Sequence, residues 1–200
     1  MARKRAFDEA AVIRAARDVF WSRGYEASSL DRLRAAMGLS RSSFYETFGS
    51  KRALFARVQA DYLADVITPR LAPLERPGAG MASLVTYFTT FAEYLRTAPP
   101  ERAGRGCLLV NTATELEVLD DEAAGVVEAY RQRVRAVFGT VLQQAVQDGD
   151  LPGDGSAERR AELLTAQVIG VFLTSRLSLP AAAALADAVA ADIRSWSQRS

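Results

Sequence analysis

The sequence predicts an all-α protein in two parts, a small N-terminal three-helix domain and a larger C-terminal helical domain. Successive stretches carry apolar residues at the i, i+3, i+7 spacing that places them on one face of a helix. Glycine- and proline-containing segments separate these stretches, and 49% hydrophobic residues in a chain of 200 suffice for a sizeable core. We place the domain boundary after residue 50, which gives domains at 1–50 and 51–200.

The stretch 28–51 predicts two short helices joined by a tight turn. A serine at its start can cap the free backbone N–H groups of the first helix. Gly38 can adopt the left-handed conformation that ends this helix, and Ser40 can cap the next one. The apolar stripe of the first helix consists of Leu30, Leu33 and Met37. Two short helices with about three turn residues between them form a helix-turn-helix.

The second helix, at about residues 41–48, is expected to expose an unusual polar face. Phe44 and Phe48 lie four residues apart and can anchor the helix to the first one. Its other side chains are an arginine, a tyrosine, a glutamate and small hydroxyls, and the arginine and hydroxyls are groups that bind DNA bases and phosphates. At Lys51 a cation adjoins the start of the next helix, where the helix dipole also attracts phosphate.

Over about residues 7–60 this pattern resembles the N-terminal domain of the tetracycline-repressor (TetR) family of transcriptional regulators. The matching residues are Phe20, Gly24, Tyr25, Ser29, Leu33, Gly38, Leu39, Ser40, Phe44, Tyr45, Phe48 and Lys51. By position, Tyr45 and Lys51 resemble the family's phosphate-contacting residues, and Arg41, Ser42 and Ser43 its base-facing ones. The full set of expected DNA-binding residues is Ser29, Arg41, Ser42, Ser43, Tyr45, Thr47 and Lys51.

Arg34 departs from the family pattern, which usually has alanine where the two helices cross. We expect either that its stem lies along the surface or that the crossing is slightly looser here.

Positive charge is concentrated in the first quarter of the chain. Residues 1–52 hold 11 Lys+Arg and 6 Asp+Glu, a net charge of +5, whereas residues 53–200 carry a net charge of −4. This segregation favours DNA as a partner of the first part only. The basic residues at positions 3–5 form either an arm that reaches DNA or a disordered tail; they are Arg3, Lys4 and Arg5.

The residue usage argues against an enzyme. The chain has no histidine and one cysteine, which excludes an internal disulfide, most zinc sites and every Cys-His or Ser-His catalytic pair. The only lysines are Lys4 and Lys51. We expect no catalytic residue, no metal site and no cofactor; the remote alternative is an enzyme that uses an aromatic pocket with Glu115 as base.

No stretch approaches the roughly 18 apolar residues that would suggest a membrane span, and the N-terminus lacks a signal-peptide hydrophobic core. The sequence therefore predicts a cytoplasmic protein.

Two helices are expected to connect and support these parts. A helix over 7–23 can brace the helix-turn-helix as the third member of a small bundle. A helix from Lys51 to Ile67, ended by Pro69, begins beside the DNA backbone and ends in the body of the protein. Because it belongs to both parts, we expect it to transmit a signal between them.

Side chains suited to a small-molecule pocket follow in the second part. A helix over 81–96 carries a stripe of large apolar and aromatic side chains, which line a pocket or form plain core. In a helix over 107–120, a thiol, an amide, a hydroxyl and a carboxylate recur at i, i+4, i+7 and i+8 and share one face. The expected ligand-binding residues are Tyr62, Phe88, Phe91, Cys107, Asn111, Thr114 and Glu115.

Cys107 has two open interpretations. A helix N-terminus with Arg102 and Arg105 nearby stabilises a thiolate, and the string RGCLLVNTATEL resembles the ligand-domain helix of a TetR-family branch that includes sensors of reactive electrophiles. A thiol-based redox or electrophile sensor is therefore the alternative to a regulator with a reversibly bound ligand. The other interpretation is a small buried side chain that only packs.

A long helix is expected at 121–147, and the last two helices, at about 157–177 and 181–196, favour association of two copies. Ala166, Gly170 and Thr174 are small residues at i, i+4 and i+8, and the final helix is rich in alanine, so helices can approach closely. Packing within one chain is the alternative. The resemblance implies a homodimer through residues 157–196. It would bind a near-palindromic double-stranded operator, with recognition helices about 34 Å apart, and a small-molecule inducer or electrophile would release it.

Overall fold

The computed structural model describes residues 8–196, and every regular element in that range is a helix. The predicted all-α class is therefore confirmed. The elements are α1 (Glu9–Arg23), α2 (Leu30–Met37), α3 (Arg41–Phe48), α4 (Lys51–Tyr62), η1 (Leu63–Ile67), α5 (Thr68–Leu71), α6 (Met81–Thr97), α7 (Pro100–Ala103), α8 (Leu108–Thr112), η2 (Ala113–Val118), α9 (Asp121–Gln147), α10 (Ser156–Ser175) and α11 (Leu179–Trp196).

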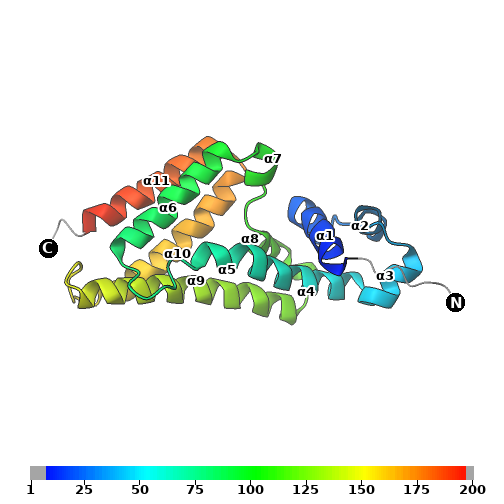
Figure 1. The fold of residues 1–200 in the computed structure, drawn as a ribbon, viewed down its shortest axis with the longest axis horizontal. Helices are drawn as coiled ribbons and strands as arrows, with labels where there is room; N and C mark the ends of the chain where they lie inside the picture. The colour runs from blue at the N-terminus through cyan, green and yellow to red at the C-terminus, as the bar shows by residue number, and fades with distance from the viewer. Residues whose placement is uncertain (1–7, 197–200) are drawn as a thin grey trace.

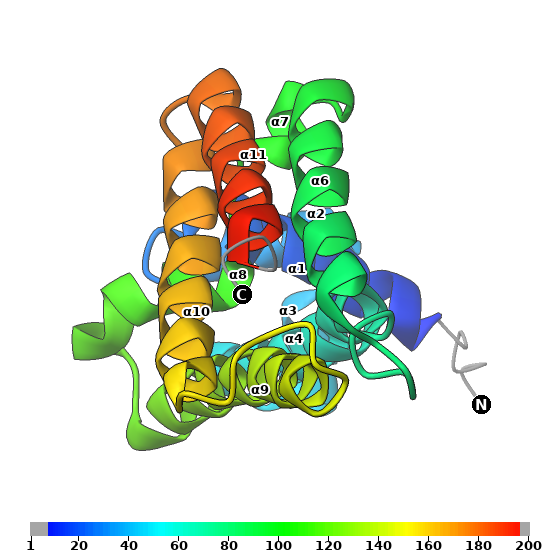
Figure 2. The same ribbon diagram turned by 90° about the vertical axis from the view of Figure 1, so that its left-hand side faces the viewer.

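The helices form two groups along the long axis of the molecule. Figure 1 shows α1, α2 and α3 at one end and α6, α10 and α11 at the other, with α4 leading from one group toward the other. Figure 2 shows α6, α11 and α10 side by side, with α9 across their ends. The most extensive helix contacts join α6 to α11 and α10 to α9. In the first group, α1 packs on both α2 and α4, as a brace for the short helices must.

One continuous core of buried apolar side chains runs through both groups. In the first group, the ring of Phe20 lies edge-on to Phe55 at a centroid distance of 4.9 Å. In the second, Phe88 of α6 stacks on Phe138 of α9 at 6.0 Å. Burial of a large apolar side chain stabilises the fold by about 1.5–3 kcal/mol, so these aromatic residues contribute strongly in both groups.

The helix that begins at Lys51 does not end before Pro69, and that prediction was wrong. The chain passes through the π-helical turn η1 into α5 and remains helical to Leu71. In the π turn the Thr68 N–H donates to the Leu63 carbonyl, five residues earlier. Pro69 lies in the first turn of α5, where a proline's missing N–H is tolerated, so the helical run continues past it.

The prediction of a single helix over 107–120 was also wrong. The α-helix covers only Leu108–Thr112 and is followed by the 3₁₀ segment η2. Glu115 has φ −122° and ψ 16°, outside the helical range, so the i+4, i+7 and i+8 positions do not share one face. The cause is tertiary, because the Glu115 carboxylate is bonded to the first helix group, as the next section shows.

The end of the chain follows the sequence prediction closely, with α10 and α11 as two long helices joined by a short turn. Across residues 8–196, none of the helices has both the length and the apolar character needed to cross a bilayer.

Candidate nucleic-acid interface and ligand cavity

The helices α2, α3 and α4 each begin directly after a serine that caps them. The Ser29 hydroxyl accepts a hydrogen bond from Arg32 N at 3.3 Å, and the Ser40 hydroxyl accepts one from Ser43 N at 3.1 Å. Ser50 does the same for the first turn of α4. Such caps satisfy backbone donors that have no partner within the helix, so the local sequence fixes where each helix starts.

The turn between α2 and α3 is closed as the sequence predicted. Gly38 has φ +65° in the left-handed region and donates its N–H to the Ala35 carbonyl. Leu33 of α2 and Phe44 of α3 are fully buried, and Phe48 is nearly so. The helix pair is therefore rigidly packed on its inner side.

The outer side of α3 presents Arg41 and Tyr45 together. Tyr45 is 45% exposed, and its ring packs edge-on against buried Phe44 at 5.4 Å. The Arg41 guanidinium carbon lies 6.0 Å from the Tyr45 ring centroid. Ser42 is exposed beside them, whereas Ser43 and Thr47 are half-buried. A guanidinium, a phenol and hydroxyls thus share one accessible helix face.

Lys51 lies at the edge of this face and is already engaged by protein groups. Its Nζ donates to the Glu26 carbonyl at 3.3 Å and lies 4.4 Å from the Tyr25 ring centroid. Burial lowers the pKa of Lys51, and the nearby Glu115 and Glu26 carboxylates oppose that shift. Lys51 therefore also ties α4 to the turn between α1 and α2.

Arg34 shows how the chain tolerates a long side chain at the helix crossing. Its guanidinium folds back to Asp31, three residues earlier, at 3.0 Å, and the side chain is 25% exposed. The stem thus lies along the surface, the first of the two expected arrangements. The basic residues at positions 3–5 lie outside the described residues.

The sequence analysis missed the contacts that join the two helix groups. The Glu115 carboxylate accepts hydrogen bonds from Tyr25 N at 3.1 Å and Glu26 N at 2.8 Å, in the turn after α1. Gly24 makes room for it, because a Cβ at that position would lie 2.2 Å from Glu115 Oε1. The carboxylate thus caps a backbone turn in the other helix group.

Further polar contacts join the two helix groups near Glu115. The Arg52 guanidinium binds Asp120 through two bonds of 2.6 Å, and Arg105 binds Asp18 at 2.7 Å. The Arg52 hydrogen bond holds the pKa of Asp120 well below its usual range, at about 2. Trp21 Nε1 donates to the Gly106 carbonyl at 3.2 Å. No sequence periodicity signals these contacts, because their partners are far apart along the chain.

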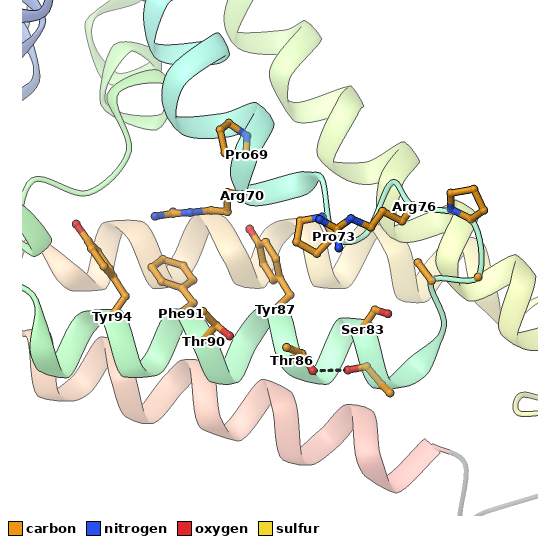
Figure 3. A pocket seen from close by; sticks show the side chains of 14 residues that line it. Pro69, Arg70, Pro73, Arg76, Ser83, Thr86, Tyr87, Thr90, Phe91 and Tyr94 are labelled. Atoms are coloured by element: carbon orange, nitrogen blue, oxygen red, sulfur yellow. Dashed lines mark hydrogen bonds between the residues drawn. The ribbon is translucent and has the colours of Figure 1, made fainter.

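A cavity of about 730 Å³ lies between the loop after α5 and the face of α6 (Figure 3). Tyr87, Phe91 and Tyr94 of α6 point into it, and Arg70 of α5 extends over their row of rings. This volume lies within the range of about 300–1,000 Å³ that holds small molecules in proteins.

Of the seven expected ligand-binding residues, only Phe91 lines this cavity. Tyr62, Phe88 and Cys107 are fully buried in the core. The other three make local or joint-forming hydrogen bonds: Asn111 donates to the Arg105 carbonyl, Thr114 donates to the Asn111 carbonyl, and Glu115 caps the turn after α1. Tyr87 and Tyr94 lie on the helix predicted over 81–96 but were not among the expected ligand-binding residues, and neither was Arg70.

Two buried tyrosines, Tyr62 and Tyr130, lie on the core side of this region, and half-buried Tyr87 lines the cavity. The Cys107 thiol lies 3.8 Å from the Tyr130 hydroxyl, and Tyr62 packs edge-on against Trp21 at 4.9 Å. Burial raises the pKa of Tyr87 to about 12 and raises those of Tyr62 and Tyr130 well above the usual value. All three therefore remain neutral at physiological pH.

A capped helix pair with an exposed arginine-tyrosine face, carried on a larger helical body with a cavity, defines a helix-turn-helix transcriptional regulator. Residues 12–58 match the family described as bacterial regulatory proteins, tetR family, and residues 80–191 match the tetracyclin repressor-like C-terminal domain. The chain belongs to the TetR family, and it is a regulator rather than an enzyme.

Several relatives support this assignment over most of the chain. The HTH-type transcriptional regulator YezE of Bacillus subtilis (strain 168) is 34% identical over 77% of this chain and 78% of its own length. The HTH-type transcriptional repressor ComR of Escherichia coli (strain K12) is 26% identical over 87% of this chain and 82% of its own. A cysteine mutant of the TetR family regulator CifR, solved with 26-bp operator DNA, is 28% identical, with a TM-score of 0.80, and the match covers 97% of this chain and all of that one.

Proposed function

We propose that this regulator is a homodimeric repressor, acting in the cytoplasm, that a small molecule releases from a near-palindromic operator. The observation that carries the proposal is the exposed face of α3, where Arg41 and Tyr45 stand together on a helix anchored by Phe44. Arginine binds guanine through two parallel hydrogen bonds, and tyrosine hydroxyls bind phosphate. The relative ComR is named as a repressor, and the CifR mutant was solved with operator DNA, which supports the same role here.

Apolar side chains exposed on α10 support the homodimer. Leu163, Leu173 and Leu177 are 57%, 43% and 89% exposed. They recur at helical spacing along a stripe with exposed Ala166 and half-buried Gly170. Such a stripe is a typical subunit interface, because a second copy can cover the leucines while the small residues allow close approach. We assign the interface to residues 157–196, and we define the dimer stripe as these five residues, four on α10 and Leu177 in the turn that follows it.

The proposed signal path runs through the continuous helical segment α4–η1–α5. It starts at Lys51 beside α3 and reaches Arg70 in the wall of the cavity. We divide the chain at 1–50 and 51–200, so this segment belongs to the ligand-binding domain, while α4 packs along α1 of the DNA-binding domain. A ligand that shifts α5 would thereby favour a dimer geometry that no longer fits the operator.

A thiol sensor at Cys107 is the second candidate, and its burial weakens it. The thiol is 0% exposed and faces Tyr130, so a reagent reaches it only if the core opens. Electrophile addition to the purified protein and to Cys107→Ser distinguishes the two mechanisms. Loss of operator binding in the native protein but not in the variant would favour the thiol sensor over the reversible ligand.

The decisive experiment measures binding of the purified protein to the DNA upstream of its own gene. We expect Arg41→Ala to weaken binding by about tenfold to a hundredfold, because a bidentate base contact contributes roughly 1–3 kcal/mol. Arg102→Ala removes the same charge from α7, which Figure 1 shows away from α3, and serves as the control. Equal effects of the two variants, or no binding by the native protein, would contradict the proposal.

The homodimer is tested by sedimentation. We expect Leu173→Glu to produce monomers that bind the operator poorly, since it places a charge in the dimer stripe. Val118→Glu is the matched control, because Val118 is similarly exposed, at 47%, but lies in η2. If the Leu173→Glu protein remains dimeric, the dimer stripe is not the subunit interface.

A further inference from the structure

Arg70 is a half-buried cation without a counter-ion. Across the described range 8–196, its guanidinium makes no hydrogen bond and no ion pair, and its recorded contacts are with aromatic rings. Other arginines of the body do have carboxylate partners: Arg96 pairs with Asp187, and Arg133 pairs with Glu75. None of the Arg70 nitrogens is among the fully buried unpaired atoms, so its N–H groups are accessible and have no protein acceptor. They are therefore available to a negative group that enters the cavity.

The rings hold the guanidinium in place without neutralising it. Its central carbon lies 5.0 Å from the Phe91 ring centroid, 5.3 Å from Phe172 and 5.8 Å from Tyr94. Figure 3 shows the side chain stretched over the row formed by Tyr94, Phe91 and Tyr87. A guanidinium that contacts ring faces keeps its N–H groups, which lie in its own plane, available to donate.

The surroundings of Arg70 strengthen its positive character. The cavity lining contains two arginines, Arg70 and Arg76, and none of the described residues in it is a carboxylate. The neighbouring Glu75 is held by Arg133 at 2.9 Å. Burial lowers the pKa of Arg70, but the neighbouring tyrosines and Cys107 oppose this and the net shift is upward. An arginine whose pKa is not lowered carries its full charge at physiological pH.

We infer that this cavity binds a small organic carboxylate with an apolar, ring-sized body, whose carboxylate pairs with Arg70 and whose body lies along Tyr87, Phe91 and Tyr94. The inference rests on the proposed function, since such an anion would be the inducer. A planar carboxylate matches the two parallel donors of a guanidinium, and the cavity of about 730 Å³ leaves room for a fused aromatic ring.

The test uses pairs of probes that differ only in charge. Binding of 2-naphthoate, benzoate and octanoate is measured by calorimetry on the full-length protein without DNA, and each carboxylate is compared with its own primary amide. We expect at least one carboxylate to bind and its amide to bind tenfold or more weakly, because a charge-assisted bidentate pair is much stronger than a neutral hydrogen bond. Equal binding of acid and amide, or no binding of any carboxylate at millimolar concentration, would overturn the inference.

Two variants locate the site. Arg70→Met keeps an apolar stem over the rings and removes the charge, and we expect it to lower carboxylate affinity tenfold or more while it leaves amide affinity unchanged. Arg76→Met removes the same charge from an exposed position in the cavity wall and should change affinity less.

The ligand-free Arg70→Met protein should melt at the same temperature as the native protein or higher, since an uncompensated charge is gone. An equal or larger loss in Arg76→Met would mean that only the general positive potential attracts the anion. If Arg70→Met fails to fold, Arg70 is structural, and the acid and amide pairs on the native protein still decide whether the cavity selects anions.

Operator binding is measured separately on the same proteins, so the two proposals fail independently. Carboxylate binding at Arg70 that leaves the affinity for the operator unchanged would support the site and contradict release by the ligand. Operator binding without carboxylate binding would support the proposed repressor role and contradict the carboxylate site.

Discussion

The helix-turn-helix and the joint segment, residues 105–120, acquire their shapes in opposite ways. In the former, Ser29 and Ser40 each cap their own helix through a backbone N–H three residues later. In the joint segment, the main polar contacts reach partners 68 to 90 residues earlier, as when Glu115 caps the turn after α1. A locally capped unit keeps its shape when its surroundings move, whereas the joint segment requires both helix groups in place. Local capping thus stabilises the proposed DNA-binding surface by itself, whereas the shape of the joint segment depends on how the two helix groups sit relative to each other.

The largest expected effect comes from Gly24, at the joint. Its backbone has φ +81° and ψ 176°, a conformation nearly restricted to glycine, and a Cβ would collide with Glu115. We expect Gly24→Ala to lower the free energy of unfolding by about 2–4 kcal/mol, as measured by urea denaturation. Gly78→Ala, at φ +80° with open space around it, is the matched control and should cost about 1 kcal/mol. If both variants lose the same amount, the close approach to Glu115 has no energetic role.

Alkaline pH should destabilise the body through its buried tyrosines. The folded pKa of Tyr87 is about 12, against 10.0 for the free side chain, because burial disfavours the phenolate. The stabilisation is therefore complete below pH 10 and is lost as the pH rises toward 12, at about 1.4 kcal/mol per pH unit. Urea denaturation across this range, repeated on Tyr87→Phe, measures the effect. A variant with the same pH slope as the native protein would contradict the assignment to Tyr87.

Removal of the Glu115 carboxylate tests the joint without a steric clash. We expect Glu115→Ala to cost about 1–2 kcal/mol, because the Tyr25 and Glu26 N–H groups lose their acceptor. Hydrogen exchange should show faster opening of the turn after α1, with α2 and α3 little changed. Glu117→Ala, an exposed glutamate two residues further along η2, is the control. Uniform acceleration over the whole chain would remove the distinction between the two regions.

The smallest effect is expected for the cap within the helix-turn-helix. Ser40→Ala should cost about 1 kcal/mol, the usual contribution of an N-cap hydroxyl. The loss should remain local to α3 in hydrogen exchange. Ser42 lies in the first turn of α3, and its exposed hydroxyl bonds to the Ser40 hydroxyl but caps no backbone N–H, so Ser42→Ala should cost less. A Ser40→Ala variant that also loosens residues 105–120 would show that the helix-turn-helix is not a self-contained unit.

The sequence by itself determined the helical class, the helix-turn-helix and its family. These features depend on neighbours in the chain: Ser40 three residues before the N–H it caps, Gly38 in the left-handed conformation that ends α2, and Phe44 four residues from Phe48. Periodicity and capping act over one or two helical turns, so a linear pattern records them. For the same reason the two last helices were placed to within a few residues.

Only the tertiary structure decided how the two helix groups meet and where the cavity lies. Glu115 leaves the helical conformation because its carboxylate satisfies two backbone N–H groups of another helix group, and helical spacing cannot show that competition. Pro69 remains within a helical run because the π turn before it shifts the hydrogen-bond register. Arg70 resembles any surface arginine in the sequence, and its role follows from three rings and a missing carboxylate that the fold brings together. Contacts between residues far apart in the chain depend on packing, and packing is settled only when the whole core forms.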